Sequence, residues 1–244
     1  MRNLKLTLEY DGTEFRGFQR QRELRTVQGM LEYRFSRLLR EQVKIVGAGR
    51  TDAGVHAIGQ VANFRTSRPL AVGRMAPVLN AALPADVKVQ ACEEVEDGFH
   101  ARRCAVSRTY RYTVIERPMP SPLLGRFALI VSERLNVAAM DGAARELLGR
   151  HDFRAFQASG SETVTTERNV LRCECRRRAD RIEIVVEADS FLYRMVRSIA
   201  ASLIEVGSGR LSPGAPAEAV ARGQRLPKLP PAPACGLCLV KVSY

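Results

Sequence analysis

Two kinds of hydrophobic spacing alternate along this chain, and they constrain its fold more than any other feature of the sequence. Apolar side chains occupy every second position in residues 4–10 and again from 110 to 114 within the stretch 107–115, which is typical of half-buried strands. Helical spacing of three or four residues follows two N-cap candidates, Thr26 and Asn136, and returns over residues 192–204. Because several strands are joined by short connections, the pattern favours antiparallel or mixed sheets over one parallel sheet.

The sequence therefore predicts an α/β (α+β) protein with two lobes. The best candidate for a boundary is the stretch 118–122, where three of five residues are proline. We expect an N-terminal lobe over residues 1–117 and a C-terminal lobe over residues 118–244.

Three shorter elements are predicted with definite ends. Residues 43–46 form a short strand that leads into a glycine-rich turn. Residues 70–82 form a helix that ends before Pro84. The helix that Asn136 caps runs on through Leu148 and is closed by Gly149.

The charge balance points to a polyanionic partner. The chain has 38 Lys and Arg against 26 Asp and Glu, which gives a formal net charge of +12. Such an excess is the electrostatic footprint of a nucleic-acid-binding protein, although a generally basic proteome would also produce it.

The apolar runs are too short for a membrane protein. No stretch approaches the roughly 18 consecutive apolar residues that a spanning helix needs. The N-terminus alternates like a strand and lacks the apolar core of a signal peptide. We therefore expect a cytoplasmic protein whose six cysteines are reduced thiols.

A polar loop at residues 47–56 is the first candidate site. Its opening Gly47-Ala48-Gly49 suggests a dinucleotide-binding turn, but that fingerprint needs a third glycine at position 52, where this chain has Asp. Arg50 lies two residues from Asp52 and could hold its carboxylate ionised, as a nucleophile or general base requires. The structural alternative is an Asp that caps backbone N–H groups beside an Arg in a surface ion pair.

Basic and aromatic residues suggest contacts with RNA. The loop 17–22 carries Arg20 and one aromatic residue, and it suits phosphate and base contact as well as it suits simple solvation. Arg111, with its neighbours Arg102, Arg103 and Arg108, could line an RNA channel. Tyr110 shares a strand face with Tyr112, where core or rim packing is the commoner role and base stacking the alternative.

The cysteine spacing does not support a metal site. Cys173 and Cys175 are separated by one residue, and Cys235 and Cys238 by two, whereas structural zinc sites use paired Cys units or suitably spaced His. We interpret these cysteines as small buried residues and expect no metal.

Taken together, the motifs resemble the bacterial tRNA pseudouridine synthase A family over nearly the whole chain and in the same order. The matching pieces are Tyr10-Asp11-Gly12, Gly17-Phe18-Gln19-Arg20-Gln21, Thr26-Val27-Gln28, Ala48-Gly49-Arg50-Thr51-Asp52-Ala53-Gly54-Val55-His56, Phe99-His100-Ala101-Arg102, Arg108-Thr109-Tyr110-Arg111-Tyr112, His151-Asp152-Phe153, Arg168-Asn169, Met195-Val196-Arg197, Glu205-Val206-Gly207 and Gly236-Leu237.

The resemblance implies an isomerase that converts uridine to pseudouridine at positions 38, 39 and 40 in the anticodon stem-loop of tRNA. It implies no cofactor and no metal, and a homodimer that binds tRNA. It also implies two similar lobes in each chain, each a mostly antiparallel sheet with helices on one face, with the active-site cleft between them.

The resemblance also assigns roles to residues. The catalytic aspartate falls on Asp52, and its partner arginine in the same motif on Arg50. The active-site tyrosine falls on Tyr110, a further arginine on Arg197 and an apolar cleft residue on Leu237. Arg20 and Arg111 are the expected substrate contacts.

Some residues depart from the family pattern, and two other classes of protein remain as alternatives. The family usually has Trp where this chain has Phe18, while Cys235, Cys238 and Arg154 also stand where other residues are common. A non-catalytic RNA-binding module would keep the basic surface without needing Asp52. A nucleotide-dependent oxidoreductase would need the third glycine that Asp52 replaces.

Overall fold

The computed structural model describes residues 1–69, 71–160 and 163–244. The chain folds into two compact units. The first joins Met1–Val106 to Leu239–Tyr244, and the second is Ser107–Cys238. The sequence predicts one lobe over residues 1–117 and another over residues 118–244, and this assignment of domains remains a prediction.

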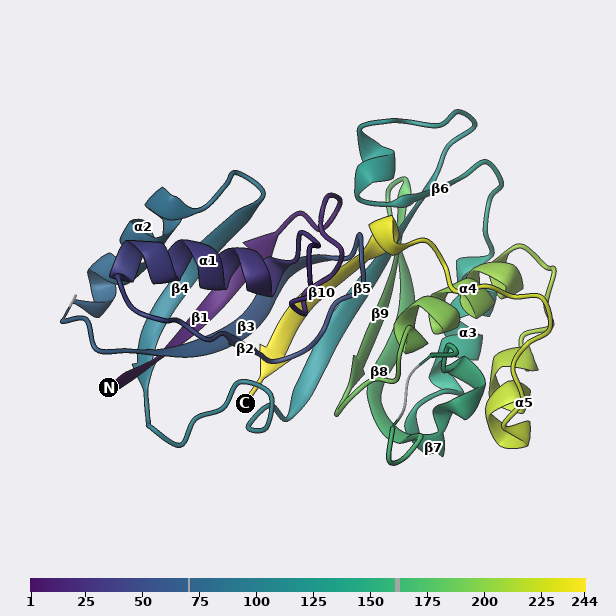
Figure 1. Ribbon diagram of the computed structural model, residues 1–244. Coiled ribbons are helices and arrows are strands. Elements are labelled where there is room, and N and C mark those ends of the chain that lie inside the picture. The colour runs from purple at the N-terminus through teal and green to yellow at the C-terminus, as the bar shows by residue number, and fades with distance from the viewer. Residues whose placement is uncertain (70, 161–162) are drawn as a thin grey trace. The chain divides into compact units, whose positions relative to one another are not determined.

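The first unit is an antiparallel sheet with two helices. Within it the strand order is β4-β1-β3-β10, and β2 pairs with β3. Figure 1 shows α1 lying across the strands, and α1 also contacts α2. The elements of this unit are β1 (Arg2–Tyr10), α1 (Val27–Leu39), β2 (Val46–Gly47), β3 (His56–Thr66), α2 (Val72–Ala82), β4 (Val87–Val95) and most of β10 (Leu237–Ser243).

The core of the first unit follows the predicted spacing. Side chains at every second position of β1 are buried, and the strand is confirmed. Thr26 is the N-cap of α1, and its Oγ1 accepts a hydrogen bond from Gly29 N at 3.3 Å. Phe35 of α1 packs against Phe64 of β3 with ring centroids 5.7 Å apart. Leu38, whose spacing from Leu31 and Phe35 predicts a place on the buried helix face, is exposed.

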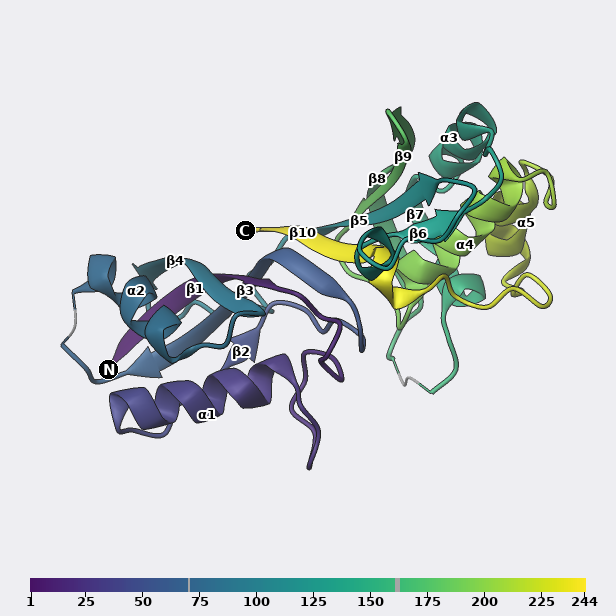
Figure 2. The same ribbon diagram turned by 90° about the horizontal axis from the view of Figure 1, so that it is seen from above.

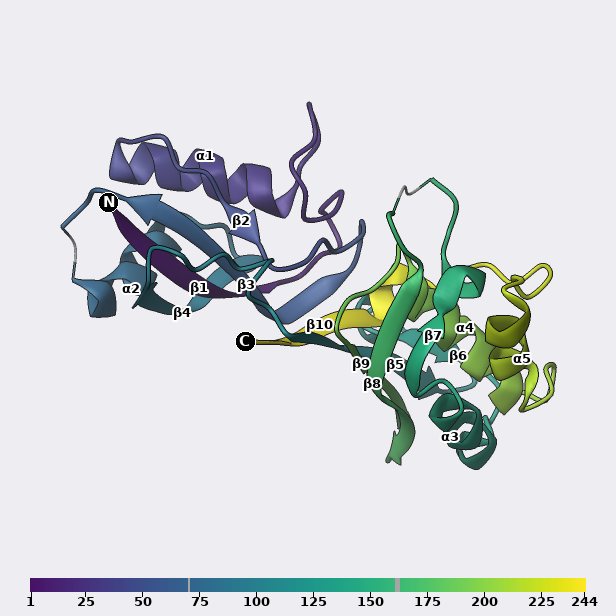
Figure 3. The same ribbon diagram turned by 90° about the horizontal axis from the view of Figure 1, so that it is seen from below.

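Like the first unit, the second unit consists of a sheet and a set of helices. Its strand order is β5-β9-β8-β7, all antiparallel, and β6 pairs in parallel with β5. Figures 2 and 3 show its helices together on one side of β8 and β9. Its elements are β5 (Ser107–Glu116), η1 (Leu124–Arg126), β6 (Leu129–Val131), α3 (Val137–Arg145), β7 (Gly149–Asp152), η2 (Phe153–Phe156), β8 (Glu167–Arg178), β9 (Arg181–Ala188), α4 (Met195–Gly207), α5 (Ala215–Arg222) and η3 (Ala234–Gly236), where η denotes a single 3₁₀ turn.

The helix α4 is the most apolar of the three α-helices described in the second unit. Ile199, Ala200 and Leu203 are fully buried, in agreement with the predicted stripe over residues 192–204. Asn136 is the predicted N-cap of α3, and its Oδ1 accepts a hydrogen bond from Ala139 N at 3.1 Å.

The ends of three predicted elements differ from the structure. The strand predicted at 43–46 is shorter and later in the structure, where β2 comprises only Val46–Gly47. Val43 and Ile45 are buried, but they belong to no strand. The helix α3 ends at Arg145, and Gly149, with a φ of +97°, begins β7 instead of closing the helix. The helix predicted over 70–82 is α2, whose described part begins at Val72, while Leu70 lies outside the described residues.

The predicted fold class is confirmed at the level of mixed α and β structure with mostly antiparallel pairing. Among the described residues, no helix is both long enough and apolar enough to cross a membrane.

A charged cluster joins two strands of the second unit to the segment that precedes α3. Glu116, at the end of β5, accepts hydrogen bonds from Leu135 N at 2.7 Å and from Arg177 Nη2 at 2.9 Å, and it also pairs with Arg177 Nη1. Arg177, on β8, donates to the Leu135 carbonyl as well. The hydrogen bonds from Arg177 hold the pKa of Glu116 below its ordinary value of 4.5.

We therefore expect Glu116→Gln to lower the free energy of unfolding at neutral pH by about 1–3 kcal/mol. Because the folded state has the lower pKa, this stabilisation is complete above pH 4.5 and is lost as the pH falls through the folded-state pKa. Urea unfolding of wild type and variant at several pH values measures it, and the difference should shrink in acid. Glu94→Gln, which removes an exposed partner of Arg2, is the control and should change stability less. A Glu116→Gln difference that grows in acid would contradict the assignment.

Candidate functional site

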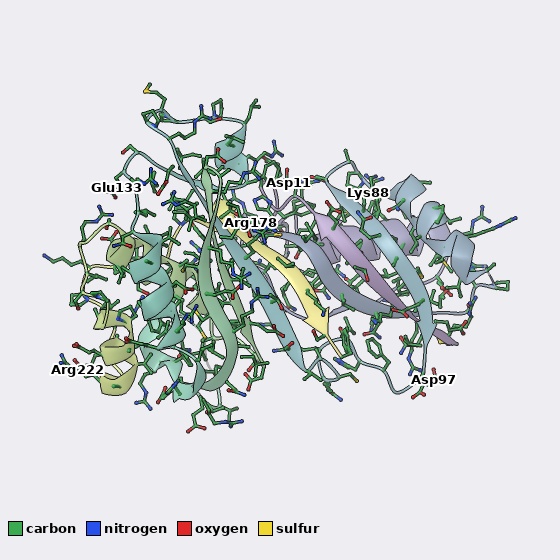
Figure 4. All side chains as sticks on the ribbon, turned by 180° about the vertical axis from the view of Figure 1, so that it is seen from behind. Asp11, Lys88, Asp97, Glu133, Arg178 and Arg222 are labelled. Carbon is green, nitrogen blue, oxygen red and sulfur yellow. The ribbon has the colours of Figure 1, made fainter. Side chains whose placement is uncertain are left out.

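The loop that carries Asp52 lies at one end of the first sheet. It connects β2 to β3, and Tyr10 at the end of β1 pairs with Ala57 at the start of β3. The loop therefore lies at the end where β1 finishes. Figure 4 labels Asp11 and Lys88 at this end and Asp97 at the opposite end.

Backbone hydrogen bonds fix this loop to the segment that follows β1. Phe18 N donates to the Thr51 carbonyl at 3.0 Å, and Gly54 N donates to the Phe15 carbonyl at 3.2 Å. Within the loop, Val55 N donates to the Asp52 carbonyl at 3.2 Å. Bonds on both sides of Asp52 thus hold the backbone that carries its carboxylate.

Two glycines allow the two segments to approach so closely. A Cβ at Gly12 would overlap the carbonyl group of Val55. Gly17 has a φ of +96°, and a Cβ there would lie 2.9 Å from the Thr51 carbonyl oxygen. Contact with the Asp52 loop therefore requires glycine at both positions. The spacing of residues in the sequence did not reveal this requirement.

His56 joins the same two segments through its imidazole. Its Nδ1 accepts a hydrogen bond from Gly12 N at 3.0 Å and lies 3.3 Å from Asp11 Oδ1. Since Nδ1 accepts, the neutral ring carries its proton on Nε2. The residue is buried and acts here as a link between the loops.

The two charged residues of the loop differ in exposure. Asp52 is half-buried, whereas Arg50 is exposed. The predicted pairing of Arg50 with Asp52 and the catalytic roles assigned to both residues stay predictions.

Arg20 is held through one nitrogen of its guanidinium, while most of its side chain is exposed. Its Nη1 donates to Glu32 Oε2 at 3.2 Å, and its side chain is 70% exposed while that of Glu32 is 11% exposed. The other oxygen of Glu32 accepts from Ile45 N at 3.1 Å and from Gln28 Nε2 at 3.1 Å. The buried carboxylate of Glu32 thus holds Arg20 in place. Gln28 and Glu32 lie four residues apart on α1, and this spacing is the sequence signal that could have indicated their contact.

Phe18, the aromatic residue of the basic loop, is unavailable for base contact. It is buried, and its ring fills the space above Gly47, where a Cβ would lie 2.5 Å from Cζ. Of the alternatives left open for this loop, base contact by its aromatic ring does not fit the structure, because the ring packs inside the first unit.

In the second unit, Tyr110 and Arg111 lie on opposite faces of β5. Tyr110 is buried and meets Phe191 edge-to-face with centroids 5.2 Å apart. Arg111 lies on the other face, with Nη1 3.8 Å from Glu183 Oε1. A single flat surface of β5 cannot present both side chains.

Arg197 and Leu237 flank a segment that packs closely in the second unit. Arg197, in the first turn of α4, donates from Nε to the Ala232 carbonyl at 2.7 Å, and its own carbonyl accepts from Ala232 N at 3.0 Å. Leu237 is buried at the start of β10. Arg197 is therefore bonded to the start of the stretch 232–237, and Leu237 is the last residue of that stretch.

The buried Tyr112 holds the same stretch from the side of β5. Its hydroxyl donates to the Pro233 carbonyl at 3.0 Å, and a Cβ on Gly236 would lie 2.6 Å from its ring. Burial raises the pKa of Tyr112 well above its ordinary range, so the phenol stays protonated as a donor.

The four cysteines considered for a metal site divide into a buried pair and a half-buried pair. Cys173 and Cys175 are buried as predicted, and burial raises the pKa of Cys173 to about 12. Cys235 and Cys238 are only half-buried, so the prediction of burial is wrong for them. Residues 1–69, 71–160 and 163–244 contain no cluster of three or more His, Cys, Asp or Glu that could hold a metal ion.

The sequence matches one protein family over most of its length. A family model described as tRNA pseudouridine synthase matches residues 7–102 and 143–244. The chain is 39% identical over 244 residues to tRNA pseudouridine synthase A 2 of Clostridium perfringens, with 100% of both chains covered. It is 43% identical to tRNA pseudouridine synthase A of Chlorobaculum tepidum, covering 100% of this chain and 98% of that one. For the protein of the same name from Azorhizobium caulinodans the identity is 44%, covering 100% and 95%.

The close approach of Gly12 to Val55 predicts an unequal effect of two Gly→Ala substitutions. We expect Gly12→Ala to lower the free energy of unfolding by about 1–3 kcal/mol, because backbone must move to admit the methyl group. Gly73→Ala is the matched control. That glycine lies in α2 with open space around it, and the change should be neutral or stabilise by up to about 1 kcal/mol. Thermal and urea unfolding measure both, and equal effects would contradict the assigned contact.

Proposed function

Because the chain belongs to the tRNA pseudouridine synthase family, we propose that it is an isomerase that converts uridine to pseudouridine in tRNA. The observation that carries the proposal is Asp52, a half-buried carboxylate on a loop whose backbone is bonded on both sides. The proposed targets are positions 38, 39 and 40 of the anticodon stem-loop.

The proposed reaction exchanges one glycosidic bond for another. The bond between C1′ and N1 of uridine breaks, the base rotates, and a new bond forms between C1′ and C5. The hydrogen on C5 is lost to solvent and N1 gains a proton, so the reaction balances without an oxidant or reductant, and we propose no cofactor. Asp52 acts as the nucleophile or base, with C6, C1′ and a sugar proton as the three sites open to it.

The remaining predicted residues support this step. We propose that Arg50 and Arg197 act with Asp52 in this step and that Leu237 excludes water. Tyr110 stacks on the target base, which has to leave its own stack at a cost of a few kcal/mol. Arg20 and Arg111 contact the RNA backbone, in keeping with the net charge of +12.

We also propose that the chain works as a homodimer in the cytoplasm, in complex with tRNA. The family resemblance supports the dimer, and the substrate supports the compartment. Light scattering of the purified protein tests the dimer, since one chain has a mass of 27.1 kDa.

Release of tritium tests the proposed reaction directly. Unmodified tRNA labelled with tritium at C5 of uridine should lose label to water when the purified chain is added, because C5 exchanges its hydrogen for the bond to C1′. Sequencing the product for pseudouridine then locates the modified position. A chain that binds tRNA but releases no tritium is a binding module.

We expect Asp52→Asn to abolish turnover and leave tRNA affinity within a few-fold of wild type. The substitution keeps size and hydrogen bonding but removes the charge, and lost catalytic groups typically cost about 10²–10⁴-fold or more. Asp97→Asn, at an exposed position at the opposite end of the sheet, is the matched control and should leave turnover unchanged. More than about a hundredth of wild-type turnover in Asp52→Asn would rule out a catalytic role for the carboxylate.

Tyr110 can be tested as a stacking residue against a purely structural role. We expect Tyr110→Phe to keep most tRNA binding because the ring face is retained. Tyr110→Leu should lose about 1–3 kcal/mol in affinity or in turnover. Single-turnover kinetics beside thermal unfolding separate the two roles. If Tyr110→Leu melts early but keeps its rate per folded molecule, Tyr110 serves only the core, where it packs on Phe191.

A further inference from the structure

A buried set of polar side chains lies beneath the loop that carries Asp52. The hydroxyl of Tyr10 lies 2.8 Å from Thr51 Oγ1, and both side chains are buried. Gln60 of β3 is fully buried, and its Nε2 donates to the Gly49 carbonyl at 2.9 Å and to the Tyr10 hydroxyl at 3.4 Å. These bonds reach the residue just before Asp52 and another residue three positions before it.

The donor chemistry gives these bonds a direction. The Gln60 Nε2 can only donate, so the Tyr10 oxygen accepts there and its hydroxyl can donate to Thr51 Oγ1. Tyr10 and Gln60 are placed by strands, because Tyr10 ends β1 and Gln60 lies within β3, whereas Thr51 belongs to the loop that they contact. Polar groups buried this deeply are costly unless bonded, and the Tyr10 hydroxyl, the Thr51 hydroxyl and the Gln60 Nε2 are all bonded, whereas the Gln60 Oε1 is buried without a hydrogen-bond partner.

The buried polar side chains stabilise the Asp52 loop and are not needed to pair the strands of the sheet. The strands β1 and β3 already pair through backbone hydrogen bonds from Arg2 to Tyr10, so their register does not need side-chain hydroxyls. Through these side-chain bonds the Tyr10 hydroxyl and the Gln60 amide reach the loop at Gly49 and Thr51. A displacement of about 1 Å at a reacting group can cost about 10²-fold in rate, so fixing this loop has a catalytic consequence.

We propose that Tyr10 and Thr51 are positioning residues for Asp52, with Gln60 supporting them from β3. Their hydrogen bond fixes the backbone immediately before Asp52 and thereby the direction of its carboxylate. This inference rests on the proposed function, and it assigns these residues no contact with the substrate.

The test compares substitutions that remove one hydroxyl each. Tyr10→Phe and Thr51→Val should each lower the single-turnover rate of pseudouridine formation about tenfold, with tRNA affinity unchanged. The double variant should be no slower than the slower single variant, because both remove the same hydrogen bond. Thr51→Ser keeps the hydroxyl and should recover most of the rate. Tyr33→Phe is the matched control. It removes an exposed hydroxyl that bonds Arg37 on α1, and it should leave the rate unchanged.

Three outcomes overturn the proposal while wild type stays active. These are unchanged rates in both single variants, fully additive losses in the double variant, and a Thr51→Ser variant as slow as Thr51→Val. If Tyr10→Phe fails to fold, the comparison of Thr51→Ser with Thr51→Val decides alone. Lower melting temperatures with normal rates per folded molecule would mean a merely structural role.

Hydrogen exchange separates this inference from the proposed function. The amides of Phe18 and Val55 donate to the carbonyls of Thr51 and Asp52, so their protection reports the order of the loop without any catalysis. Both amides should exchange faster in Tyr10→Phe than in Tyr33→Phe. A wild-type chain that forms no pseudouridine would overturn the function alone, whereas unchanged protection in Tyr10→Phe would overturn the positioning role.

Discussion

The contact on which the site depends is the close approach of two backbone segments at one end of the first sheet. The segment after β1 meets the loop before β3 with no room for a Cβ at Gly12 and little at Gly17. Hydrogen bonds between Phe18 and Thr51 and between Gly54 and Phe15 follow from that approach. Excluded volume therefore sets the path of the chain on both sides of Asp52, and hydrogen bonds then fix it.

The same principle, a buried group that holds an exposed or half-exposed one, recurs around this loop. Glu32 is buried and bonded to Ile45 N, and it tethers Arg20 while leaving the guanidinium largely in solvent. Tyr10 and Gln60 are buried and hold the residues before Asp52. An enzyme that works on a large, flexible polyanion benefits from such support, because the side chains that act on the substrate are then set before it binds.

Elements whose signal is local could be predicted from the sequence. Thr26 and Asn136 are the N-caps that their spacing indicated, and β1 and α4 have the predicted buried faces. The absence of glycine at position 52 excluded a dinucleotide fingerprint and directed attention to Asp52. Features that depend on distant contacts were missed. Gly12 against Val55 and Tyr10 against Thr51 join residues about 40 positions apart, and no periodic pattern encodes such a pair. The two-residue strand β2 is too short for any alternation to mark its ends.

The central claim is that contact between these backbone segments sets Asp52 for the isomerisation. Its most direct test is the single-turnover rate of Gly17→Ala compared with Gly209→Ala. Both glycines have positive φ, so both variants carry backbone strain, but only Gly17 has the Thr51 carbonyl within reach of the added methyl, while Gly209 has open space. The account predicts that Gly17→Ala loses at least about tenfold in pseudouridine formation on tRNA per folded molecule, and that Gly209→Ala keeps its rate. Equal rates in the two variants would contradict it.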